Sequence, residues 1–159
     1  MNDTQRIFSA ILFVTIIPLA LCVNGAHSQG MQRASEVIQN KTSDIELVGN
    51  VTKVVDGDTL DISGIRVRLS LVDTPERGQV GFKEAKDFVE SLCLGKKGEL
   101  DVDNGQRRGD RYGRELGIVY CDGVNVNERL VNNRLAKIFT EYCDVSEFSN
   151  EQWAKSDCS

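Results

Sequence analysis

The stretch VVDGDTLDISGIRVRLSLVDTPE, residues 54–76, decides the fold expected for this chain. Residues 56–59 favour a chain reversal, because glycine tolerates positive φ and aspartate bonds its own backbone. After a second turn, apolar residues recur with a period of two, at Ile65, Val67, Leu69 and Leu71. This alternation predicts a strand with one face in the core and the other face carrying Arg66 and Arg68.

Acidic residues lie at both ends of this hairpin. Pro75 interrupts the strand ladder, so Asp73 and Glu76 leave the sheet on an irregular segment, where Asp58 meets them if the hairpin folds back. Paired carboxylates without histidine or thiolate suit a hard cation, and a backbone carbonyl of the irregular segment favours Ca²⁺ over Mg²⁺. The adjacent arginine makes sense if a phosphate lies between it and the cation. The alternative is a surface hairpin with solvated charges.

Three motifs give the chain a resemblance to the staphylococcal nuclease (thermonuclease) family. They are D-G-D-T at 56–59, R-L-x-x-V-D-T-P-E at 68–76 and Y-G-R at 112–114, and V-N-E-R-L-V follows at 126–131. Their order and spacing are close to the family's, over about residues 51–155. The resemblance implies an α+β, mainly β fold: a five-stranded OB-fold Greek-key barrel with two to three helices packed against it, spanning 45–159.

The resemblance also implies an activity, which is secreted, Ca²⁺-dependent hydrolysis of DNA and RNA at single-stranded or unpaired regions by a monomer. In this reading Glu76 is the general base, and Arg68 and Arg114 hold the phosphate. The implied Ca²⁺ ligands are Asp58, Asp73 and the Thr74 carbonyl. The implied substrate contacts are Arg111 and Tyr112 near the terminal phosphate and Tyr142 against a base.

This chain departs from the family pattern in two places. The loop after Glu76 is several residues shorter than in well-known members, and Thr140 stands where a second stacking tyrosine is usual. Both departures bear on substrate contacts. Two other functions are the alternatives: a catalytically inactive OB-fold nucleic-acid-binding module, which would be expected to lose the carboxylates or arginines that this chain retains, and a secreted Ca²⁺-binding structural module. A Ca²⁺-binding structural module would leave Arg68 and Arg114 without a partner.

Periodicity and turn residues predict the remaining elements. Asn125 is expected to cap a short helix, with Glu128 three residues later. A helix is expected to open at Ser149 and to carry Trp153. The predicted strands are 45–55, 59–62, 65–72, 99–103 and a fifth through Leu116, Ile118 and Tyr120, with a helix at 82–94. Residues 101–105 resemble a calcium loop, but Gln106 and Tyr112 occupy the sixth and twelfth positions, so the segment is predicted to be a turn.

The N-terminus has the features of an export signal. An uncharged apolar run at 7–23 follows Arg6, and Ala26-His27-Ser28 offers small residues for cleavage, which predicts a signal peptide at 1–28 and a flexible linker at 29–44. The run is near the length of a bilayer span, so an uncleaved membrane anchor is the alternative. A lipoprotein site at Cys22 is a further alternative, although the bulky Leu21 departs from that pattern.

Charge and histidine content exclude some chemistries. The net charge of −5 argues against a broad basic surface, although arginines 107, 108, 111 and 114 cluster within eight residues. His27, the only histidine, lies in the predicted signal peptide. A catalytic imidazole and a Ser-His-Asp triad are therefore excluded from the mature domain.

Four cysteines follow the predicted signal peptide, namely Cys93, Cys121, Cys143 and Cys158. An even count in an oxidising compartment predicts two disulfides. The absence of C-x-x-C spacing argues against zinc. Their pairing cannot be read from four cysteines alone, but 93–121 and 143–158 are favoured, because the second pair brackets a short C-terminal segment.

Overall fold

The computed structural model of the chain describes residues 45–106 and 109–159. The predicted signal peptide (1–28), the predicted linker (29–44), Arg107 and Arg108 lie outside these residues. Within them, no helix has the length and apolar character that a membrane crossing requires.

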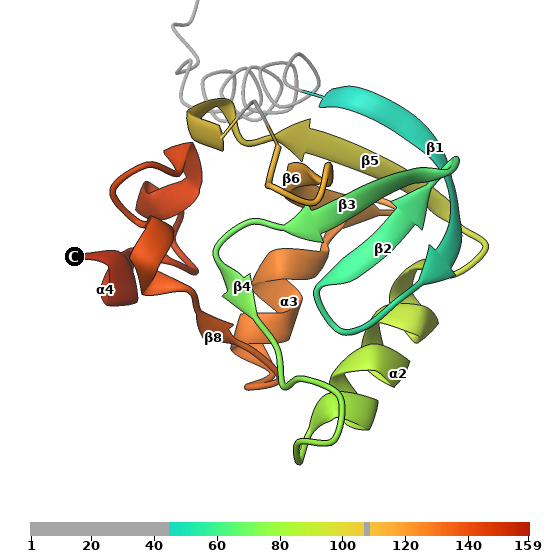
Figure 1. Cartoon of the computed structure of the whole chain (residues 1–159), viewed down its shortest axis with the longest axis horizontal. Helices are drawn as coiled ribbons and strands as arrows, with labels where there is room; N and C mark the ends of the chain where they lie inside the picture. The colour runs from blue at the N-terminus through green and yellow to red at the C-terminus, as the bar shows by residue number, and fades with distance from the viewer. Residues whose placement is uncertain (1–44, 107–108) are drawn as a thin grey trace, which may run out of the picture. The chain divides into compact units, whose positions relative to one another are not determined.

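Five strands form a closed barrel (Figure 1). They are β1 (Ile45–Val54), β2 (Thr59–Ile62), β3 (Ile65–Leu69), β5 (Lys97–Val102) and β6 (Glu115–Cys121). Antiparallel pairs join β3 to β2, β2 to β1, β1 to β5 and β5 to β6. A parallel pair between β3 and β6 closes the barrel. The predicted five-stranded OB-fold is therefore confirmed.

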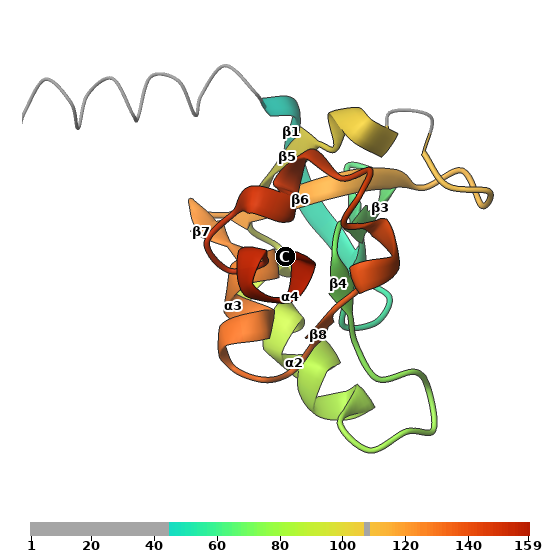
Figure 2. The ribbon, with the colours of Figure 1, turned by 90° about the vertical axis from the view of Figure 1, so that its left-hand side faces the viewer.

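The remaining elements lie around the barrel (Figures 1 and 2). A two-residue strand, β7 (Val124–Asn125), extends the sheet, while β4 (Val72–Asp73) and β8 (Lys137–Ile138) form a separate ladder. The α-helices in the described residues are α2 (Phe82–Cys93), α3 (Val126–Asn132) and α4 (Lys155–Cys158). The 3-10 helices there are η1 (Asn104–Gln106), η2 (Thr140–Tyr142) and η3 (Glu147–Asn150).

The core fills the barrel and extends beneath α2 and α3. Its fully buried side chains are apolar, among them Leu60, Ile62, Val67, Leu69, Leu100 and Ile118. The prediction that Ile65 joins this face was wrong, because Ile65 is 43% exposed. It is the first residue of β3, next to the Ser63–Gly64 turn, where the strand leaves the covered part of the barrel.

The strand predicted at 65–72 is interrupted. β3 ends at Leu69, Leu71 takes a left-handed φ of 58°, and β4 begins at Val72. The buried Asn127 holds this turn, because its Nδ2 donates to the Ser70 carbonyl at 2.9 Å and its Oδ1 accepts from Val119 N–H at 3.1 Å. The interruption turns Asp73 away from the barrel and towards Arg68.

Both favoured disulfides are present in the structure, Cys93–Cys121 and Cys143–Cys158. The predicted cap also holds, because Asn125 accepts from the Glu128 N–H at 3.0 Å. The last helix was placed wrongly. The buried Trp153 precedes α4, and the segment around Ser149 is the 3-10 helix η3.

Candidate active site

A cleft of about 750 Å³ lies between the β3–β4 turn, the β5–β6 connection and η2. Acidic side chains reach it from Asp56, Asp73 and Glu76. Basic and aromatic side chains also line the cleft. They belong to residues predicted to contact the phosphate or a base, namely Arg68, Arg111, Tyr112, Arg114 and Tyr142. The fold thus gathers predicted site residues separated by as many as 74 positions in the sequence, from 68 to 142.

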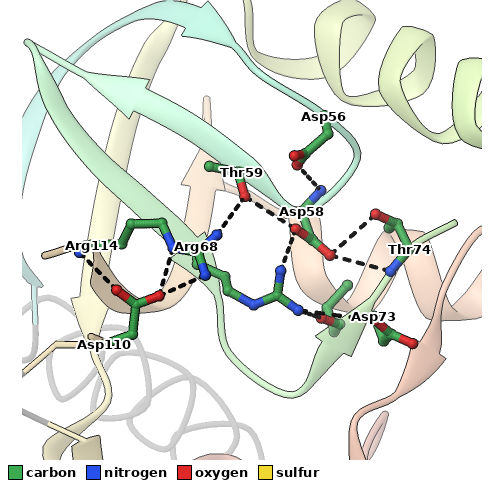
Figure 3. Close-up of polar contacts among 9 residues, drawn as sticks. Asp56, Asp58, Thr59, Arg68, Asp73, Thr74, Asp110 and Arg114 are labelled. Atoms are coloured by element: carbon green, nitrogen blue, oxygen red, sulfur yellow. Dashed lines mark hydrogen bonds and ion pairs between the residues drawn. The ribbon is translucent and has the colours of Figure 1, made fainter. Parts of the chain in front are cut away.

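Asp58 lies behind the cleft and is 3% exposed. Its Oδ1 accepts from Arg68 Nη1 at 2.6 Å, and its Oδ2 accepts from Thr74 through the backbone N–H at 3.2 Å and the hydroxyl at 3.1 Å (Figure 3). Gly57 permits this approach, because a Cβ there would lie 2.9 Å from the Thr74 side chain. Asp58 therefore reaches the segment that carries Asp73 and Glu76, but it does so through Thr74 rather than through either carboxylate.

Burial is the main cause that raises the pKa of Asp58 to about 6 from 3.8, and the nearby Asp56 raises it further. Arg68 and the hydrogen bonds from Thr74 and Thr59 act in the opposite direction. A buried carboxylate that is costly to ionise is stabilised when a cation lies beside it. This environment is suited to a metal ion.

The implied metal ligands are all hard oxygens, as Ca²⁺ prefers. They come from Asp58, Asp73 and the Thr74 backbone. Within residues 45–106 and 109–159, no three side chains of His, Cys, Asp or Glu are grouped so that they could hold a metal. The two carboxylates and the carbonyl are oxygen ligands of the kind that Ca²⁺ accepts, with water completing its coordination.

Arg68 lies between Asp58 and Asp73 and contacts both carboxylates. The β2–β3 register sets it opposite Thr59, and its Nη2 lies 4.0 Å from Asp73 Oδ1 while donating to the Val72 carbonyl at 3.3 Å. Its guanidinium carbon lies 5.8 Å from the centre of the Phe139 ring. An arginine with carboxylates on one side and an aromatic face on another is held in place before any phosphate binds.

Arg114 enters the cleft from the start of β6. Its Nε donates to Asp110 Oδ2 at 2.6 Å, and its Nη1 donates to the Thr59 hydroxyl at 3.4 Å. Thr59 in turn donates to Asp58 Oδ1 at 3.1 Å. A continuous polar chain therefore links Arg114 to the Arg68 side of the cleft (Figure 3).

Hydrogen bonds set the pKa of Asp110. Burial acts to raise it, but the backbone and side-chain hydrogen bonds from Arg114 and the backbone bond from Tyr112 together outweigh burial, and the pKa lies below 3.8. Asp110 is thus a carboxylate that stays ionised and holds Arg114.

Two aromatic groups complete the cleft. The Tyr112 ring, 67% exposed, lies 4.9 Å from the guanidinium carbon of Arg111 and 5.3 Å from that of Arg114. Tyr142 meets Phe139 edge-to-face, with ring centres 4.9 Å apart. These rings offer stacking faces next to cations, which suits bases and phosphates.

Glu76 is exposed at the rim of the cleft. Its backbone N–H donates to Gln79 Oε1 at 2.8 Å, and the Gln79 backbone N–H donates to the Glu76 carbonyl at 2.8 Å. These reciprocal bonds close the short loop after Glu76 into a defined turn.

Several residues of the site were not predicted from sequence, namely Thr59, Gln79, Asp110 and Phe139. Asp110 had a recognisable signal, since it lies four residues before Arg114 in a turn-forming segment where aspartate commonly bonds nearby backbone. Phe139 meets Arg68 only through tertiary folding, whereas Gln79 bonds Glu76 three residues away, and Thr59 bonds the adjacent Asp58 as well as the distant Arg114.

The comparisons with known proteins agree with this architecture. The family model described as "Staphylococcal nuclease homologue" matches residues 66–156, more than half of the chain. The chain belongs to this family.

Individual relatives carry endonuclease names. The chain is 38% identical over 102 residues to "Uncharacterized endonuclease" of Escherichia coli O157:H7, covering 61% of this chain and 64% of that protein. It is 38% identical over 130 residues to "Endonuclease YncB" of Bacillus subtilis (strain 168), covering 68% of this chain and 59% of that protein. The chain therefore spans less than two thirds of the length of these relatives.

Proposed function

We propose that this chain is an exported nuclease that hydrolyses phosphodiester bonds in DNA and RNA with Ca²⁺. The observation that carries the proposal is the convergence of Arg68 and Arg114 on one cleft with Glu76 at its rim. Family membership and the endonuclease names of the relatives support the same reaction class. Two disulfides and the N-terminal apolar run support export.

The two arginines bind the phosphate. Each guanidinium carries five N–H donors, and the carboxylates Asp58 and Asp110 occupy only some of them, so donors remain for phosphate oxygens. Because the arginines are already fixed, they stabilise the charge that develops on phosphorus oxygens without reorganising.

Glu76 acts as the general base. Its exposed carboxylate accepts a proton from the water that attacks phosphorus, and the Gln79 bonds to the Glu76 backbone hold the turn that carries it. Asp58, Asp73 and the Thr74 carbonyl would hold Ca²⁺, which supplies positive charge next to the phosphoryl oxygens. Arg111 and Tyr112 bind the terminal phosphate, and Tyr142 stacks on a base.

Digestion of plasmid DNA and of single-stranded RNA, with CaCl₂ or with a chelator, tests the proposal. We expect both substrates to be cleaved with Ca²⁺ and neither with chelator. Glu76→Gln should lower turnover by about 10²- to 10⁴-fold while oligonucleotide binding persists. Glu84→Gln, on the exposed first turn of α2 outside the cleft, is the matched control and should retain activity.

Two results would contradict the proposal. Near wild-type turnover by Glu76→Gln would place the base elsewhere. Oligonucleotide binding without cleavage under every metal condition would establish the inactive binding module instead.

A further inference from the structure

A second groove, of about 190 Å³, opens beside the catalytic cleft and shares Asp73 with it. It lies where β4 pairs with β8, two strands that run side by side in Figure 2. Arg134 and Lys137 line it on one side and Gln79 lines it on the other. The groove therefore joins the proposed Ca²⁺ ligands to a pair of cations that the proposed mechanism does not use.

Lys137 lies directly opposite Asp73 in the β4–β8 register. Facing residues of an antiparallel pair project from the same side of the ladder. However, the Asp73 carboxylate approaches Arg68, at 4.0 Å, and no ion pair joins it to Lys137. In the part of the chain that the structure describes, the Lys137 ammonium has no hydrogen-bond or ion-pair partner.

Arg134 has an unusual backbone. Its φ is +58°, in the left-handed region, at the end of α3 where glycine or asparagine is the usual residue. Its N–H donates to the Val131 carbonyl at 2.9 Å, so the turn itself needs no arginine side chain. No described residue pairs with its guanidinium. Strained backbone at a groove with an unpaired cation points to a binding role.

Some surface cations of this acidic chain pair with neighbouring carboxylates. Arg66 pairs with Asp61, and Lys97 pairs with Glu99. The two cations of the groove differ from these, because they line it together with Asp73 and still form no ion pair with that carboxylate.

We propose that Arg134 and Lys137 bind a phosphodiester of the same nucleic-acid strand, next to the one being cleaved. This inference rests on the proposed nuclease function. A strand whose scissile phosphate lies between Arg68 and Arg114 can continue past Asp73 into the groove, because the cleft and the groove share that residue. There the two unpaired cations attract its next phosphate and keep the strand on one path.

The test compares a double variant, Arg134→Asn with Lys137→Gln, with the wild type. Asparagine tolerates the left-handed backbone, so the fold should persist, and an unchanged or higher melting temperature checks this. The matched control is Lys53→Gln with Lys155→Gln, which removes the same charge at residues that line neither the cleft nor the groove.

Two probes separate the groove from the cleft. One is a nitrophenyl ester of a thymidine phosphate, which fills only the cleft, and the other is an oligothymidylate of about twenty nucleotides, longer than one OB-fold site. For the groove variant, KM for the oligonucleotide should rise on the order of tenfold, because contacts between charged groups are lost. Hydrolysis of the ester should not change.

Salt dependence gives a second readout. The slope of log binding constant against log salt should fall by about 0.7 for each phosphate contact that the groove variant loses. A neutral methylphosphonate at the linkages flanking the scissile phosphate should weaken binding by the wild type more than binding by the groove variant. Equal KM, salt slope and methylphosphonate effect in the groove and control variants would overturn the inference.

The proposed nuclease function can fail separately. If the wild type cleaves neither probe, the proposed nuclease function is wrong. The groove assignment is then still tested by fluorescence anisotropy, which compares the salt slope of oligothymidylate binding between the groove and control variants. If the wild type cleaves both probes but the groove variant behaves like the control, only the groove assignment fails.

Discussion

Asp110 holds Arg114 by both its backbone and its side chain. Oδ1 accepts from the Arg114 N–H at 3.0 Å, while Oδ2 lies 2.6 Å from both Nε and Nη2. The same carboxylate accepts from the Tyr112 N–H at 2.9 Å. One aspartate thus shapes the turn and aims the guanidinium, so the direction of Arg114 depends on a residue that does not itself contact phosphate.

Asp110→Asn should lower turnover by about tenfold to a hundredfold. The amide keeps one acceptor but turns an NH₂ group towards the guanidinium, so Arg114 is released from its fixed position, and misplacement of about 1 Å costs rates of this order. Single-turnover cleavage of a labelled oligonucleotide at saturating Ca²⁺ measures the effect. KM should change less than the rate constant.

The control for this variant is Asp61→Asn. Asp61 also forms a bidentate ion pair, in its case with Arg66, but this pair lies on an exposed surface outside the cleft. Its loss should leave turnover unchanged. Equal effects of the two substitutions would show that Asp110 has no positioning role.

The ionisation of Asp110 gives a pH prediction. Its folded-state pKa is depressed, so its contribution to stability is fully present above the unfolded value of 3.8 and is lost as pH falls through the lower folded value. A carbonyl-detected NMR titration should place its midpoint below 3.8. In Arg114→Gln the midpoint should rise, since burial then acts with less opposition; a midpoint that does not move would contradict the assigned cause.

Sequence reasoning succeeded where local pattern and local chemistry coincide. The D-G-D-T turn, the alternation through Val67 and the cap at Asn125 all appear as predicted. In each of these cases the residue and its partner lie within a few positions, so spacing alone determines the geometry.

It failed where a distant partner decides the outcome. The predicted strand at 65–72 breaks because Asn127, far along the chain, bonds the Ser70 carbonyl. Ile65 is exposed because the barrel closes further along β3. Phe139 reaches Arg68 only through the β4–β8 ladder, which consists of two residues on each strand and has no sequence signature of its own.

Phe139→Leu should lower the rate of cleavage by roughly threefold to tenfold. Leucine keeps the apolar volume but removes the aromatic face beneath Arg68, and such contacts contribute about 0.5 to 2 kcal/mol. Phe82→Leu is the control, because its ring lies the same 5.8 Å from the Arg77 guanidinium but does not line the cleft. Equal rates for the two variants would remove Phe139 from the site.

The C-terminal disulfide should contribute about 3 kcal/mol to the free energy of unfolding, because it closes a loop with a sequence separation of 15. Urea denaturation of Cys143→Ser with Cys158→Ser measures this loss. The Cys93–Cys121 bridge is buried at both ends, so its removal should cost at least as much. A double variant at 143 and 158 with unchanged stability would show that the bridge is absent from the mature protein.

The buried Asp103 carboxylate joins the β5–β6 connection to the C-terminal segment. It accepts from the Ser146 hydroxyl at 2.6 Å and from the Gln106 side-chain amide at 2.9 Å through Oδ2. Its Oδ1 accepts from the N–H groups of Gly105 at 3.1 Å and Glu147 at 3.2 Å. Asp103 is the acceptor in all four bonds, so the site requires a side chain with two acceptor oxygens.

Asp103→Asn should therefore destabilise the fold by about 3 kcal/mol, because the new NH₂ group faces the Gln106 amide and one donor loses its acceptor in a buried site. Ser146→Ala removes only one of the bonds and should cost less, about 1.5 kcal/mol. Urea midpoints at constant m-value compare the two variants with the wild type. The reverse order, with Ser146→Ala the more damaging, would mean that the hydroxyl rather than the carboxylate holds the two segments together.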